Sequence, residues 1–100
     1  MRMTRTLTDA ARDEMRRRQE ALSRLQWELR HAGVRTRLSR RRNGRWRLAV
    51  LMPGWTEKVM CAGAEDFYSY VTAHGRLLGP ADDVRHVAQT LALMVERRRR

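Results

Sequence analysis

Two stretches with alternating residue character, 34–41 and 45–52, flank an Asn-Gly pair at positions 43 and 44. An Asn-Gly pair between such stretches is a strong short-range signal for a β-hairpin. The same region contains seven arginines and no acidic residue: Arg35, Arg37, Arg40, Arg41, Arg42, Arg45 and Arg47. A chain with this pattern must turn its apolar residues inward and most of these charges outward.

The length of the turn decides which side chains share a face of this hairpin. A two-residue loop, Asn43-Gly44, would place Arg35 and Arg37 beside the apolar residues of the second strand. A three-residue loop, Arg42-Asn43-Gly44, instead places Val34, Thr36 and Leu38 there. We therefore predict the three-residue loop, with Gly44 in the left-handed conformation. In this register five arginines share the opposite face: Arg35, Arg37, Arg41, Arg45 and Arg47.

An amphipathic helix is predicted on each side of the strands. In residues 9–32 apolar side chains recur at the helical period, although Arg18 interrupts the stripe and Trp27 lies well off it. The second helix is predicted to begin at Gly79-Pro80, because proline suits the first turn of a helix. The carboxylates of Asp82-Asp83 then complement the positive end of the helix dipole.

The remaining strands are predicted at residues 55–62 and 67–73, joined by a turn at residues 63–66. The expected fold is α+β, in the order α-β-β-β-β-α. We expect the strands to form a four-stranded antiparallel meander, with both helices packed on one face of this sheet. We expect a flexible segment at residues 1–8, a single domain at 9–96 and a basic tail at 97–100, since 100 residues suffice for one core.

Residues 25–94 resemble a group of small uncharacterised actinobacterial proteins with an α-β(4)-α arrangement. The motifs that carry the resemblance are Leu29-Arg30-His31-Ala32-Gly33-Val34, Arg45-Trp46-Arg47-Leu48-Ala49-Val50, Val59-Met60-Cys61, Phe67-Tyr68-Ser69-Tyr70 and Gly79-Pro80-Ala81-Asp82-Asp83. The resemblance implies the fold and no particular activity. The chain is also similar in topology to double-stranded-RNA-binding domains, but it has Asp82 and Asp83 where those domains grip phosphates with lysines, so their mode of docking is not expected.

The net charge of +11 is unevenly distributed along the chain. Residues 1–50 hold 15 arginines against 5 acidic residues, whereas residues 48–84 have a net charge of −3. The protein should therefore have a basic side, which favours a polyanionic partner. The chain has no apolar signal core and no long apolar segment, and Cys61 is its only cysteine. We expect a cytoplasmic protein that has no membrane partner.

No combination of residues indicates catalysis, a cofactor or a metal site. The three histidines, His31, His74 and His86, are far apart and lack a ligand spacing. Cys61, in an apolar strand, is expected to be a small buried hydrophobe. The acidic pairs Glu65-Asp66 and Asp82-Asp83 are typical of a turn and a helix start. We therefore expect a protein that is not an enzyme.

Nucleic acid, DNA or RNA, is the first partner to test. In this interpretation the five arginines of the outer face contact phosphates, and Arg42 and Asn43 at the tip enter a groove. The alternative is a solvated face whose arginine content reflects a GC-rich genome. Self-repulsion of like charges on adjacent strands favours the functional interpretation. In another class of function, the protein is an adaptor or accessory subunit, in a homodimer, that binds an acidic protein partner.

The aromatic residues allow two interpretations as well. Those of the strands, Trp46, Trp55, Phe67, Tyr68 and Tyr70, are either core and cross-strand packing or a platform on which unpaired bases stack. Trp27 lies off the apolar stripe of its helix. It is a candidate contact with a protein partner or with a second copy of the chain.

Overall fold

The fold is α+β, with two helices and one antiparallel sheet. The computed structural model describes the backbone of residues 2–100 and the side chains of residues 9–100. In chain order the elements are α1 (Arg2–His31), β1 (Thr36–Arg40), β2 (Trp46–Met52), β3 (Trp55–Ala64), β4 (Phe67–Thr72), β5 (Leu77–Pro80), a short 3₁₀ helix η1 (Ala81–Asp83) and α2 (Val84–Arg99).

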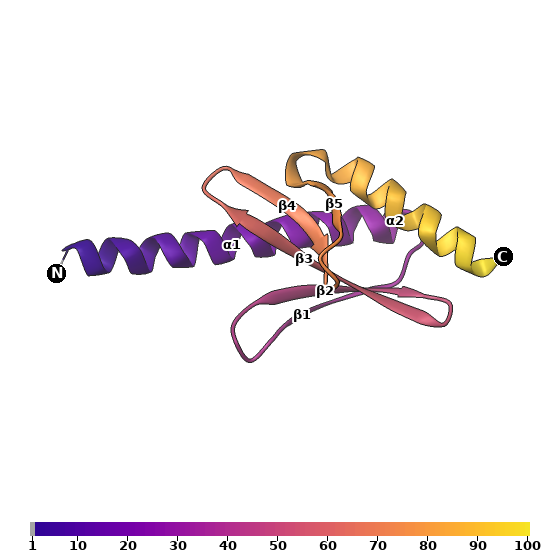
Figure 1. Cartoon of the computed structure of the whole chain (residues 1–100), viewed down its shortest axis with the longest axis horizontal. Coiled ribbons are helices and arrows are strands. Elements are labelled where there is room, and N and C mark those ends of the chain that lie inside the picture. Colours follow the sequence, from indigo (N-terminus) through magenta and orange to yellow (C-terminus); the bar gives the residue numbers. More distant parts are fainter. Residues whose placement is uncertain (1) are drawn as a thin grey trace.

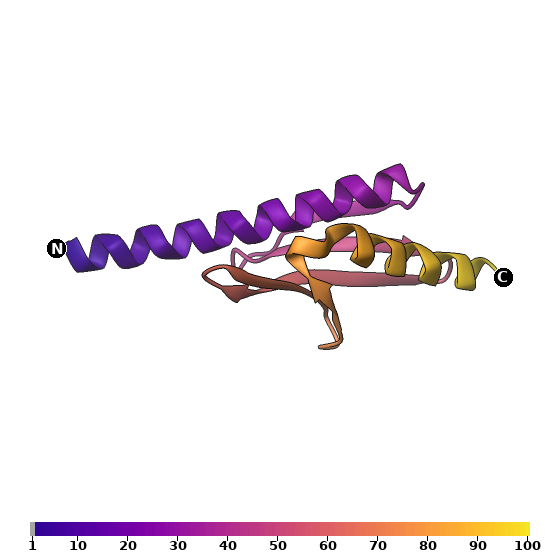
Figure 2. The ribbon, with the colours of Figure 1, turned by 90° about the horizontal axis from the view of Figure 1, so that it is seen from above.

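The helices form one layer and the sheet forms the other (Figures 1 and 2). Helix α1 contacts β1, β2 and β3, while α2 contacts α1, β2 and β5. Both views show α1 and α2 running in roughly the same direction, with the start of α1 extending beyond the sheet. This overhang makes the molecule elongated, with extents of 58 × 27 × 23 Å. The sheet therefore has one face covered by helices and one open face.

The sheet has five strands in the order β1-β2-β3-β4-β5, so the prediction of four strands is wrong. The additional strand, β5, lies where a loop and the start of the second helix were predicted. It pairs with β4 through Ser69↔Pro80 and Tyr70↔Gly79, with an irregularity after Tyr70. A Cβ atom added to Gly79 would lie 2.9 Å from Val87 of α2, so glycine allows β5 to run directly against this helix.

The predicted register of the first hairpin is confirmed. Strands β1 and β2 pair through Leu38↔Leu48 and Arg40↔Trp46. The nitrogen of Arg41 then donates to the carbonyl oxygen of Arg45 at 2.8 Å, which leaves a three-residue loop at positions 42–44. The Gly44 nitrogen donates to the Arg41 carbonyl oxygen at 2.9 Å, and Gly44 has a φ of +84°. The positive φ is the left-handed conformation that this loop requires and that glycine adopts without strain.

The core lies between the helices and the covered face of the sheet. It contains Leu22, Leu25 and Leu29 from α1, Val87, Ala88, Leu91 and Val95 from α2, and Leu48, Val50, Val59 and Tyr70 from the strands. The fully buried Tyr70 donates a hydrogen bond of 2.6 Å from its hydroxyl to the carbonyl oxygen of Ala21, which joins β4 to α1.

Both helices differ from their predicted bounds. Helix α1 begins at Arg2 rather than at residue 9. The flexible segment predicted at residues 1–8 includes Met1, which lies outside the described residues, and its flexibility stays a prediction. Helix α2 begins later, at Val84, after the 3₁₀ turn that contains Asp82 and Asp83. It extends to Arg99, so most of the predicted tail at residues 97–100 is the last turn of a helix.

Candidate nucleic-acid interface

Five arginines lie on the open face of the first hairpin. Strand residues alternate between the two faces of a sheet, and Leu38, Leu48 and Val50 face the helices. The same pairing places the intervening arginines on the open face, including Arg35, whose carbonyl oxygen accepts from the nitrogen of Leu51 at 3.0 Å. Arg47 is partly buried, and the other four are exposed: Arg35, Arg37, Arg41 and Arg45.

No carboxylate of residues 9–100 forms an ion pair within 4.0 Å with these five guanidinium groups. Among the described side chains, every ion pair within 4.0 Å is formed by arginines of α1 and α2, with carboxylates of the helices or of the β3–β4 turn. The register also places no aspartate or glutamate on the open face of β1 to β4. Glu57, the one acidic residue within these strands, is buried on the other face and accepts a 2.9 Å hydrogen bond from Trp55 Nε1. The charged side chains that β1 to β4 place on the open face are therefore all cations.

Lys58 extends the cationic face onto the third strand. It is exposed and is paired with Ala49, whose neighbours along β2 on this face include Arg47. We did not predict this residue as part of the site. Its position was readable from the sequence, because Thr56 and Lys58 alternate with Glu57 and the buried Val59.

The tip of the hairpin presents the remaining predicted residues, Arg42 and Asn43, to solvent. The Asn43 Oδ1 atom accepts a hydrogen bond of 3.0 Å from the backbone nitrogen of Arg45, which fixes the turn. Arg40 differs from its neighbours because it lies on the helix side of β1, within 3.7 Å of the position of a Cβ atom added to Gly44.

The strand aromatics do not form a common stacking platform. Trp46, Tyr68 and Tyr70 face the helices and pack in or against the core. Phe67, which is 83% exposed, is the aromatic residue that projects from the open face. Trp27 is 58% exposed on α1 and lies against the ring of His31, with ring centroids 3.8 Å apart. It belongs to the helix layer and is separate from the five arginines of the open face.

The sheet splits beside the part of the open face that carries these five arginines, which we call the arginine face. Pairing of β2 with β3 ends at Leu48↔Val59, whereas the β1–β2 and β3–β4 hairpins each continue to their own turns. Figure 1 shows these two hairpin tips spreading apart near α1. The split contains a cleft of about 470 Å³, lined by Met15, Arg18, Asn43, Gly44, Arg45, Trp46, Met60, Cys61, Ala62, Gly63 and Val71. Sequence reasoning did not predict this cleft.

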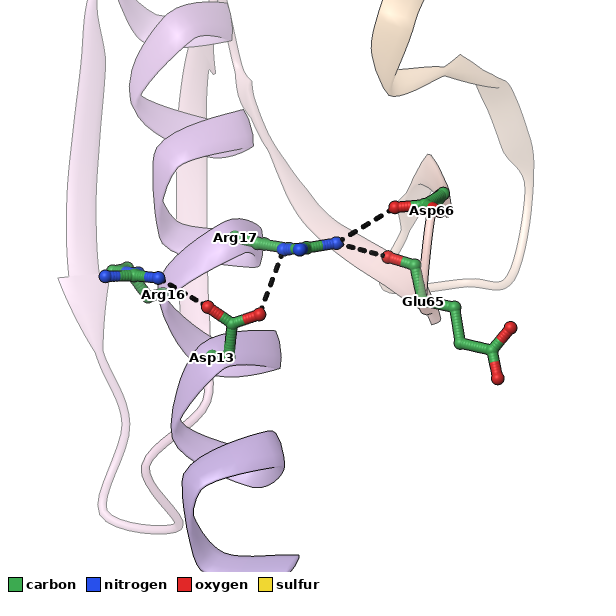
Figure 3. A network of polar contacts seen from close by, with 5 residues as sticks. All are labelled: Asp13, Arg16, Arg17, Glu65 and Asp66. Carbon is green, nitrogen blue, oxygen red and sulfur yellow. Dashed lines mark hydrogen bonds and ion pairs between the residues drawn. The ribbon is translucent and has the colours of Figure 1, made fainter. Parts of the chain in front are cut away.

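Next to the cleft, Arg17 of α1 joins the helix to the turn of the β3–β4 hairpin (Figure 3). Arg17 NH1 donates to the Glu65 carbonyl oxygen at 2.8 Å and contacts Asp66 Oδ1 at 3.1 Å. Arg17 Nε contacts Asp13 Oδ2 at 3.1 Å, and Arg16 pairs with the same carboxylate. Asp13 above all, and then Asp66, raise the pKa of Arg17. This network fixes the turn of the β3–β4 hairpin against the helix.

Arg18 lies on the α1 side of the same cleft. Its NH2 group donates to the Gly63 carbonyl oxygen at 2.7 Å and lies 3.8 Å from Glu14 Oε2. Its Nε atom is buried and has no hydrogen-bond partner among residues 9–100. The interruption that Arg18 makes in the apolar stripe of the helix is thus explained by its position under the split.

Cys61 lines the cleft as a protonated thiol. Its side chain is buried, and burial raises the pKa of the thiol to about 11 from an ordinary value of 9.0. Because the thiolate is the reactive form, we expect native protein at pH 8 to be alkylated by iodoacetamide about 100-fold more slowly than the urea-unfolded chain. Initial alkylation rates measure this difference, and equal rates would contradict it. The folded state should also lose stability as the pH rises from about 9 to about 11, because only the unfolded chain then releases this proton.

Comparisons with family models, curated proteins and solved structures found no match. The resemblances inferred from the sequence motifs therefore remain predictions. Residues 2–100 form no helix that is apolar over a length able to cross a bilayer. Among the side chains described, no three histidine, cysteine or carboxylate groups gather as metal ligands would.

Proposed function

We propose that this protein binds the phosphate backbone of nucleic acid with the arginine face of its first hairpin, β1–β2. The observation that carries the proposal is the register of β1 and β2, which gathers five guanidinium groups on a face without acidic residues. Along a strand, side chains on one face repeat about every 6.8 Å, and the neighbouring strand lies about 4.8 Å away. Like charges at this spacing repel one another, so a polyanion lying across them relieves the repulsion.

Binding through this face is expected to be largely independent of sequence. Arginine side chains that contact phosphates fix the position of a nucleic acid but do not read its bases. Arg42 and Asn43, at the exposed tip, are the residues best placed to reach base edges in a groove. We therefore expect a weak sequence preference that depends on these two side chains.

The salt dependence of binding tests the proposal. If five phosphates are neutralised, log K for duplex DNA should fall with log salt concentration at a slope of about −4.5. Fluorescence anisotropy with a labelled duplex, measured over a range of salt concentrations, gives this slope. A slope near zero, or no binding at low salt, would contradict phosphate binding by the hairpin.

A second candidate function is that of an adaptor for an acidic protein. Large exposed apolar side chains favour it, since Trp27, Leu77 and Leu93 are 58%, 66% and 60% exposed. In this case the untagged protein should purify at low salt with a protein partner or as a dimer, without excess absorbance at 260 nm. Co-purified nucleic acid would instead support the first proposal.

A further inference from the structure

The cleft between the two hairpins opens on the same side of the sheet as the arginines. Met60 and Val71 are paired across β3 and β4, and both belong to the open face. Arg45, which directly precedes β2, also lies on this face and lines the cleft. Met15 and Arg18 reach the cleft from α1 on the opposite side of the sheet. The cleft therefore runs inward from the cationic surface to the helix.

The walls of the cleft are mostly apolar. Trp46 lines one side, and Met60 and Val71 line the other. The volume of about 470 Å³ is within the usual range of pockets for small organic groups. A flat aromatic group that enters this space would contact the indole of Trp46 and the side chain of Met60, both of which interact favourably with π systems.

The polar groups at the inner end of the cleft favour a ligand that carries a hydrogen-bond acceptor. Arg18, at the inner end, lies 3.8 Å from the carboxylate of Glu14, which offsets much of its charge. Its buried Nε–H group nevertheless has no acceptor among residues 9–100. An unpartnered buried donor is costly, and a ligand carrying a carbonyl oxygen or a ring nitrogen would remove that cost. Nucleobases combine a flat π surface with such acceptors.

We propose that this cleft binds an unpaired nucleobase of the nucleic acid whose phosphates lie on the arginine face. The inference rests on the proposed function and extends it to a class of ligand. A base that is stacked and paired within a duplex cannot enter a cleft inside the sheet, whereas a base in a single strand, bulge or end can. Because Arg45 belongs to both the arginine face and the cleft, one nucleotide can place its phosphate on the first and its base in the second.

A comparison of normal and abasic oligonucleotides tests the proposal. In the double variant Trp27→Phe and Trp55→Phe, Trp46 is the only remaining tryptophan. We expect a single-stranded oligonucleotide to quench its fluorescence and an abasic strand of equal length to leave it unchanged. The abasic strand should also bind about 10-fold more weakly, as expected for the loss of one stacked base. A fully paired duplex should bind through its phosphates without quenching.

A blocked cleft provides the matched control. Ala62 and Ala64 are both exposed on the open face of β3, but only Ala62 lines the cleft. The Ala62→Phe variant should remove the difference between normal and abasic strands while duplex binding is retained. The Ala64→Phe variant should behave as the unmodified protein does.

Three results would overturn the inference. Equal affinity for normal and abasic strands, with unchanged Trp46 fluorescence, would show that phosphate binding holds but that the cleft accepts no base. Absence of binding to every oligonucleotide would overturn both this inference and the proposed function. Equal quenching by poly-glutamate would mean that the cleft responds to an acidic chain and does not select a base.

Discussion

Replacing Arg37 and Arg47 together by glutamate is expected to weaken binding to duplex DNA at least about 100-fold at about 0.1 M salt. At that salt concentration each phosphate contact increases the binding affinity by a factor of about 8, so the loss of two contacts lowers the affinity about 60-fold. The introduced carboxylates then repel the phosphates and increase the loss. The Arg37→Glu and Arg47→Glu double variant should be compared with the unmodified protein by fluorescence anisotropy.

The control is a second double variant with the same change in net charge. Arg30 on α1 and Arg97 on α2 are exposed residues of the helix layer, and Arg30→Glu with Arg97→Glu should reduce binding by less than about 10-fold. Thermal unfolding separates loss of binding from loss of folding. The hairpin variant should be at least as stable as the unmodified protein, since each new glutamate lies among the remaining cations of the open face, Arg35, Arg45 and Lys58. Equal weakening by both variants would mean that the hairpin is not the contact surface.

The arginine face could be predicted because two local signals agree. The alternation of residue types places Leu38 on the same face as Leu48 only with a three-residue loop, and Gly44 can adopt the left-handed conformation that this loop requires. Both signals depend on residues close together in sequence. The placement of the arginines then follows from the geometry of a strand, without knowledge of the rest of the fold.

The fifth strand could not be predicted in the same way. The sequence Leu77-Leu78-Gly79-Pro80 has no alternation, and Gly-Pro before an aspartate pair is typical of a helix start. What makes this segment a strand is its pairing with β4 and the close approach of Gly79 to Val87. The pairing exists only once β4 has formed, and the contact with Val87 only after the second helix has packed, so tertiary structure overrides the local preference.

The cleft also depends on tertiary structure. It exists because β2 and β3 separate beyond Leu48↔Val59 while α1 passes under the gap. The sequence contained one indication of it, the charged Arg18 within an apolar helix stripe. A charge at such a position needs a polar partner, but only the folded chain shows that this partner is the carbonyl oxygen of Gly63.

Replacement of Gly63 by alanine is expected to destabilise the protein by about 3 kcal/mol or more. The sequence suggested a turn at this glycine, but the structure places it within β3, paired with Tyr68. A Cβ atom added here would lie 2.0 Å from the carbonyl oxygen of Phe67, and the φ of Gly63 is +121°. Since the clash is with backbone, no side chain can move to relieve it. Backbone strain and overpacking each cost about 1–3 kcal/mol, and here they act together.

Gly54→Ala is the matched control, because Gly54 also has a positive φ, of +70°, but nothing lies within 4 Å of an added Cβ atom. This variant should lose only the left-handed backbone preference, about 1–2 kcal/mol. Thermal unfolding should therefore give a midpoint at least about 5 °C lower for Gly63→Ala than for Gly54→Ala. Equal midpoints would show that the β3–β4 hairpin can shift to accept a side chain at Gly63. The β3–β4 hairpin, which Arg17 and Arg18 link to α1, would then be less rigid than these contacts imply.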